Sequence, residues 1–126
     1  MNRETDQDLV TMTRRTIFSL INLISDKKQQ KKYEKENPKV SVNLELMCMW
    51  FHDNYPVGKQ WFKECFSFEE QRLITEFSNY YEERLNKLPE KDILKIYLRN
   101  KSWKEIMKKA QDTVKLLNIE DYKSFQ

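Results

Sequence analysis

The feature that most constrains this chain is its shortage of turn-forming residues. Glycine occurs once in 126 residues, at Gly58, and proline occurs three times, at Pro38, Pro56 and Pro89. A fold of many short strands needs frequent turns, and these two residue types supply much of the backbone geometry that turns require. The sequence therefore predicts an all-α fold, and a chain of this length is expected to form a single domain of about five helices over residues 1–126.

The composition indicates a packed interior without a membrane span. Hydrophobic residues make up 39% of the chain and aromatic residues 13%, which is enough for a core despite a charged fraction of 34%. No apolar run approaches the roughly 20 residues that cross a bilayer, and the first eight residues are polar and acidic rather than a basic leader. Cys48 and Cys65 have apolar neighbours, which is typical of reduced, buried thiols. We expect a cytoplasmic protein.

The N-terminal segment predicts an amphipathic helix. Its apolar residues recur at intervals of three and four up to Ile24, and Thr5 or Asp6 can cap its first turn. Similar spacing predicts two short helices, over 60–65 and over 92–99.

Two longer helices are marked by capping boxes, in which a serine is followed three residues later by a glutamate. Ser67 with Glu70 opens the first, and Ser102 with Glu105 opens the second. Asn118 suits the C-terminal end of the second helix, because asparagine tolerates the left-handed backbone conformation found there. The two helices are expected over 68–88 and 103–117.

Two neighbouring segments allow more than one structure. Residues 27–39 contain six lysines and little apolar surface, which predicts either a solvated helical extension or a linker. Residues 40–46 alternate between apolar and polar side chains as a strand does, whereas the residues that follow do not. We prefer a helix that starts at Ser41 or Asn43 and runs to about Asn54, because few other segments are suited to pair with a strand.

No constellation of residues predicts an enzyme, a cofactor or a metal. His52 is the single histidine, so the usual set of imidazole ligands for a metal cannot be completed. Cys48 precedes His52 by four residues, but no glycine-rich loop accompanies either cysteine and apolar surroundings raise the pKa of a thiol. The single glycine also excludes phosphate-binding glycine motifs. Carboxylates are numerous, but nothing selects a catalytic pair, and a solvated helix face is the simpler interpretation.

Charge is distributed unevenly along the chain. Residues 43–83 are locally acidic, with acids at 45, 53, 64, 69, 70, 76, 82 and 83 against bases at 59, 63 and 72. Bases concentrate in 27–39 and in the last third. The lysine run is the best argument for nucleic-acid binding. It contains no arginine and is interrupted by Glu34 and Glu36, so we favour a solvated helix there and consider nucleic acid an unlikely partner.

The stretch from Met47 to Phe68 combines aromatic residues with acids. The aromatic side chains are either core residues or exposed anchors for a partner that the acids attract. Periodicity alone leaves both interpretations open.

The segment from Leu44 to Pro89 resembles a group of small bacterial proteins. It contains Leu-Glu-Leu-Met-Cys-Met-Trp-Phe-His-Asp-Asn-Tyr, then Phe-Ser-Phe-Glu-Glu, and it ends in Leu-Pro. This order of aromatic and acidic residues is similar to that of immunity proteins of contact-dependent growth inhibition systems, except that His52 replaces the first acid of an Asp-Asp pair. The resemblance covers about a third of the chain.

The resemblance implies a stoichiometric toxin inhibitor without turnover. The partner would be a cognate toxin domain, often a nuclease with a basic cleft, whose active site the immunity protein blocks. An acidic, aromatic patch would then stand in for nucleic-acid phosphate. The partner-binding residues expected for this patch are Trp50, Asp53, Glu69, Glu70 and Glu76. The alternative is a small nucleic-acid-associated or regulatory helical protein that uses the lysine-rich segment and the basic C-terminal helix.

Overall fold

Helices make up most of the computed structural model, which describes residues 3–54 and 60–117 and contains no β-strand within them. Five of these helices have seven or more residues, so the predicted all-α fold of about five helices is confirmed. They are α1 (Arg3–Ser25), α2 (Lys27–Glu36), α3 (Val42–Cys48), α5 (Phe68–Glu83) and α7 (Lys101–Leu117). The shorter elements are α4 (Gln60–Lys63), α6 (Leu94–Tyr97), a π-helix (Met49–Asn54) and a 3₁₀ turn (Leu85–Lys87).

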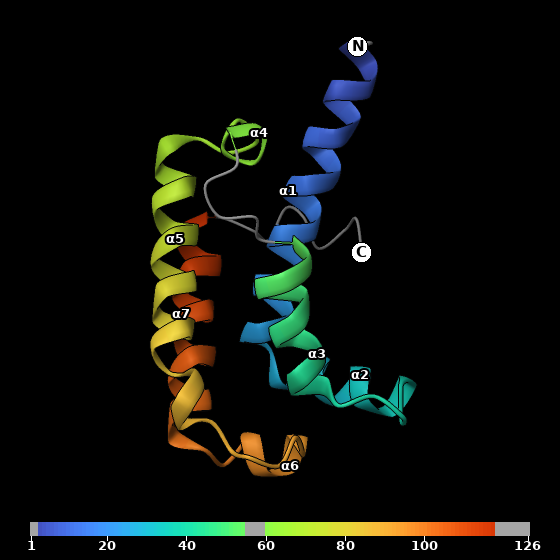
Figure 1. The fold of residues 1–126 in the computed structure, drawn as a ribbon, viewed down its shortest axis with the longest axis vertical. Coiled ribbons are helices and arrows are strands. Elements are labelled where there is room, and N and C mark those ends of the chain that lie inside the picture. Colours follow the sequence, from blue (N-terminus) through green and yellow to red (C-terminus); the bar gives the residue numbers. More distant parts are fainter. Residues whose placement is uncertain (1–2, 55–59, 118–126) are drawn as a thin grey trace.

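Helix α7 is the centre of the packing, because it contacts both α1 and α5 (Figure 1). Its buried residues recur at intervals of three and four, so one stripe faces the interior along its whole length. They include Trp103, Ile106, Ala110 and Val114. Helix α7 runs antiparallel to α5, while α6 lies at the end of the molecule where α7 begins. None of the helices in the described ranges is both long and apolar enough to cross a membrane.

The helix starts show which predicted caps form. Ser67 and Glu70 make both bonds of the predicted capping box, which is confirmed. The box predicted at Ser102 is wrong, because α7 begins at Lys101, before that serine. Asn100 Oδ1 instead accepts a bond from the backbone N–H of Trp103 at 2.9 Å. Asparagine is one of the strongest capping residues, and it comes two positions before the serine.

The bounds of other predicted helices also change. Helix α1 begins at Arg3, so Thr5 and Asp6 lie inside its first turns rather than at its cap. The helix predicted over 68–88 ends at Glu83, and a 3₁₀ turn follows it. The helix predicted over 92–99 is limited to Leu94–Tyr97. Asn118 lies outside the described residues.

The lysine-rich segment is helical over Lys27–Glu36, and it packs against the domain instead of extending away from it. Asp26 caps α2 by accepting bonds from the backbone N–H groups of Lys28 and Gln29. Gln30 is fully buried. A side chain of α2 therefore belongs to the interior, which the lysine-rich composition alone does not suggest.

Residues 42–54 are helical, as preferred over a strand. Helix α3 starts at Val42 and continues directly into the π-helix. The π-helix packs on α5: the Trp50 and Phe77 rings lie 5.1 Å apart and the Phe51 and Tyr81 rings 5.0 Å apart, both edge to face. Much of the aromatic surface in this stretch is therefore core.

Candidate protein-binding surface

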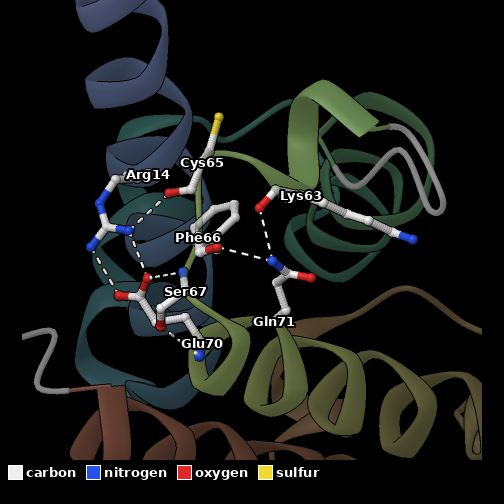
Figure 2. A network of polar contacts seen from close by, with 7 residues as sticks. All are labelled: Arg14, Lys63, Cys65, Phe66, Ser67, Glu70 and Gln71. Atoms are coloured by element: carbon white, nitrogen blue, oxygen red, sulfur yellow. Dashed lines mark hydrogen bonds and ion pairs between the residues drawn. The ribbon is translucent and has the colours of Figure 1, made fainter.

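A network of polar contacts fixes the start of α5. Glu70 Oε1 accepts a bond from the backbone N–H of Ser67 at 2.9 Å, and Ser67 Oγ accepts one from that of Glu70 at 3.1 Å. Arg14 of α1 donates to both carboxylate oxygens of Glu70 at 2.7 and 2.9 Å, and to the carbonyl of Cys65 at 2.9 Å (Figure 2). The first turn of α5 is thereby held on α1.

The turn that precedes α5 is held from the other side by Gln71. Its Nε2 donates to the carbonyls of Lys63 and Phe66, both at 2.9 Å (Figure 2). The Phe66 ring is buried and lies 5.7 Å from that of Phe18, edge to face. Polar contacts and ring packing together determine how α5 enters the domain.

The outward side of α5, which we call the α5 outer face, is acidic and carries one large aromatic ring. Its residues are exposed and project over one arc of the helix, opposite the buried stripe of Leu73, Phe77 and Tyr81. They are Phe68, Glu69, Arg72, Thr75, Glu76, Asn79, Glu82 and Glu83. Four acids and one base therefore share this face.

Arg72 connects two of these acids. Its guanidinium bonds to both carboxylate oxygens of Glu69 and, at 2.7 Å, to Glu76. These bonds hold the pKa of the Glu69 carboxyl below its ordinary value and raise the pKa of Arg72. The arginine thus partly neutralises both carboxylates, and the four acids leave the face with a net negative charge.

Phe68 is the most exposed large hydrophobic residue that the structure describes, with 89% of its surface accessible. It is the first residue of α5, directly after the Ser67 cap. Phe68 is the last aromatic residue of the stretch that begins at Met47, but it is not among the five residues expected to bind a partner. Helical spacing contains the missing signal, because Phe68 lies opposite the stripe formed by Leu73 and Phe77.

Trp50 does not belong to a surface patch, which corrects the expectation from its acidic surroundings. Its side chain is fully buried, and its Nε1 donates to Ser78 Oγ at 3.1 Å. Burial of an indole removes a large apolar area from water, and the serine satisfies its single donor. Trp50 is therefore a core residue.

The other four residues expected to bind a partner do not all lie on the α5 outer face. Glu69 and Glu76 are exposed on the α5 outer face. Glu70 is largely buried by its contacts with Arg14, so it supports the face from beneath. The side chain of Asp53 lies outside the described residues. The structure thus brings two of the five together on one surface and adds Phe68 beside them.

The thiols and the histidine are not among the residues of this face. Cys48 and Cys65 are both free, and burial raises the pKa of the Cys65 thiol. His52 is exposed on the π-helix. Within residues 3–54 and 60–117, no three histidine, cysteine or carboxylate side chains are grouped as metal ligands would be. That the chain is not an enzyme stays a prediction.

Comparison with known proteins assigns the chain to no family. No protein-family model, curated protein or solved structure matches it. Its function has to be argued from the residues and contacts described above.

Proposed function

We propose that this chain neutralises a toxin domain by binding it stoichiometrically through the α5 outer face. The observation that carries the proposal is Phe68, whose ring is 89% exposed among the acids of that face. An aromatic ring that enters a pocket of a partner is a common source of binding energy, and surrounding charges accelerate association and select the partner. The resemblance to immunity proteins supports the same assignment.

The charge of the face indicates a basic partner. From Glu69 to Glu83 the acids extend over about 21 Å of helix, at a rise of about 1.5 Å per residue. This length suits an interface of ordinary size, which covers about 800 Å² on each partner. A row of carboxylates of this kind resembles the phosphates of a nucleic acid, so the cleft of a nuclease toxin is the partner that it fits.

The contacts beneath the face reduce the entropy lost on binding. Arg14 and Ser67 hold Glu70, and Gln71 holds the turn before it, so the backbone that carries Phe68 is already ordered. A preorganised surface loses less conformational freedom when a partner binds. Inhibition should then saturate at one copy of this chain per toxin domain and should leave the toxin chemically unchanged.

The test is a pull-down of the tagged full-length chain, co-expressed with the product of the gene immediately upstream, after nuclease treatment. The wild type should recover one polypeptide in a one-to-one ratio. Phe68→Ala should weaken the affinity at least tenfold. The triple variant Glu69→Gln, Glu76→Gln, Glu82→Gln should mainly slow association, with a smaller effect at higher salt.

Matched controls separate the face from general surface effects. Leu116→Ala removes an apolar side chain of α7 that is also exposed, and Glu36→Gln removes an exposed carboxylate of α2. Both should bind as the wild type does. Recovery of no polypeptide, or equal recovery by Phe68→Ala and the wild type, would count against the proposal.

A further inference from the structure

Basic residues from three segments of the sequence gather at the end of the molecule opposite the start of α5. Helix α6 contacts α2 there, and α7 begins nearby (Figure 1). A groove of about 560 Å³ lies between α2 and α6. Its cations are Lys27, Lys31, Lys95 and Arg99, with Leu94 and Leu98 as apolar lining and Glu34 as the one acid.

A second groove lies next to the first. It has a volume of about 380 Å³ and is lined by Arg99, Lys101 and Lys104, together with Lys108 and Glu105. The two grooves are neighbours, because Arg99 lines both of them. Of the seven cations that line the two grooves, Lys108 pairs with Asp112 at 3.1 Å. We call the other six the basic surface: Lys27, Lys31, Lys95, Arg99, Lys101 and Lys104.

The charge of the basic surface is available to a partner. All six side chains are exposed, and none of them forms an ion pair with another residue of the described ranges. Glu105, one of the two acids in the grooves, lies 3.8 Å from the guanidinium of Arg84. On the α5 outer face, by contrast, Arg72 forms ion pairs with Glu69 and Glu76 and so neutralises part of the charge.

The contacts of α2 keep part of this surface in place. Gln30 lies between Lys27 and Lys31 in the sequence, and its side chain is buried. Its Oε1 accepts a bond from Trp103 Nε1 at 3.3 Å. On α6, the Tyr97 hydroxyl donates to Asp92 at 3.2 Å. The Tyr97 ring itself is buried and lies 5.5 Å from that of Trp103. The lysines of α2 and Lys95 of α6 are therefore presented by helices that are anchored to the core.

We infer that the basic surface binds the phosphate backbone of a nucleic acid without reading its bases. Clustered unpaired cations displace the counterions of phosphates, which gives sequence-independent affinity. Base stacking needs a free aromatic face, but the Tyr80 ring at the second groove is covered by the Arg84 guanidinium, 3.4 Å from the ring centre. Among the six residues of the basic surface, Arg99 is the one arginine that could form paired bonds with a base edge.

From the sequence, the acids Glu34 and Glu36 within the lysine run made nucleic acid an unlikely partner, and the structure changes this interpretation. Glu36 lies 3.9 Å from Lys32, which does not line either groove, so its charge does not cancel that of Lys27 and Lys31. The partner in this inference differs from the basic toxin, and its surface shares no residue with the α5 outer face. Each proposal can therefore fail while the other holds.

Fluorescence anisotropy with the full-length chain tests the inference. The probes are a labelled 20-nucleotide single-stranded RNA, a 20-base-pair duplex DNA and a polyglutamate peptide of similar charge, each at 50 and 200 mM salt. Both nucleic acids should bind with dissociation constants on the order of 10⁻⁶ to 10⁻⁴ M, and affinity should fall steeply with salt. The Lys31→Glu, Arg99→Glu variant should lose at least tenfold.

The control is Lys32→Glu, which makes the same charge change on α2 at a residue outside both grooves. Its affinity should stay within about threefold of the wild type, because Lys32 lines neither groove and at most one phosphate contact outside them would be lost. Circular dichroism checks that each variant folds. Equal losses in the Lys31→Glu, Arg99→Glu variant and in Lys32→Glu, or no binding at 50 mM salt, would overturn the inference. Tighter binding of polyglutamate with the same dependence on Arg99 would assign the surface to an acidic protein instead.

Discussion

Trp103 and Gln30 are joined in the interior by a hydrogen bond of 3.3 Å from Nε1 to Oε1, and neither side chain is accessible to solvent. Gln30 Nε2 also donates to the carbonyls of Leu23 and Ile24 at 3.1 and 2.9 Å. These carbonyls belong to the last turn of α1, where no intrahelical donor follows. One buried amide therefore connects α1, α2 and α7.

The first prediction concerns this amide. Gln30→Leu leaves the indole donor and the Ile24 carbonyl without their partner, while the Leu23 carbonyl keeps its bond from the Asp26 N–H at 3.3 Å. It should therefore lower the free energy of unfolding by about 1–3 kcal/mol. Urea denaturation measures the change, and hydrogen exchange should show faster opening of α2. Gln111→Leu, which breaks an exposed bond to the Ser25 carbonyl, is the control and should have a smaller effect. Equal stability of the two variants would contradict the role of Gln30.

The second prediction separates Trp50 from Phe68. Trp50→Ala removes a fully buried indole and should lower the free energy of unfolding by about 3–5 kcal/mol. Phe68→Ala removes an exposed ring and should change it by less than about 0.5 kcal/mol. Thermal and urea unfolding of both variants measure this difference. A stable Trp50→Ala protein would show that the indole is not a core residue.

Local spacing was sufficient to predict the helices, but not the contacts between them. The Ser67–Glu70 box could be found because both of its bonds lie within three residues. The same pattern at Ser102 was misleading, because α7 already begins at Lys101 and Asn100 caps it.

The candidate site was predicted in part for a related reason. Glu69 and Glu76 lie opposite an apolar stripe that the sequence itself displays, so their exposure follows from helical spacing. Glu70 binds Arg14, which is 56 residues away in the sequence, and no local pattern reveals that partner. Trp50 and Phe51 both pack on α5, and the π-helix that places these two neighbouring rings there is not visible in the local spacing. Tertiary packing decided each of these cases.

The third prediction concerns the reactivity of the thiols. Burial raises the pKa of Cys65, so little thiolate is present at neutral pH and a reagent reaches it poorly. Labelling of the folded protein with Ellman's reagent at pH 7 should modify Cys65 more slowly than Cys48, which is only partly buried. The single-cysteine variants Cys48→Ser and Cys65→Ser assign the two rates. A Cys65 that reacts as fast as a free thiol would contradict its burial.

The last prediction is a pH dependence that arises at Glu70. Its bonds with Arg14, and then those with Ser67, hold the pKa of the Glu70 carboxyl below its ordinary value despite partial burial. A carboxyl whose pKa is lower in the folded state stabilises the fold above its unfolded pKa, about 4.3. That stabilisation is lost as the pH falls through the folded pKa.

Glu70→Gln keeps a side chain that can complete the capping box but removes the charge that pairs with Arg14. The variant should be less stable than the wild type at pH 6 by about 1–3 kcal/mol. The difference should shrink at pH 3, which lies below the unfolded pKa of about 4.3, because protonation of the carboxyl then favours the unfolded wild type. Urea unfolding at both values measures it. Glu69→Gln is the control, since Glu69 also has a lowered pKa but is exposed to solvent, which screens its pairing with Arg72. If the two variants lose stability equally and with the same pH dependence, the Arg14–Glu70 pair does not hold α5 on α1, and the surface around Phe68 is not preordered by that contact.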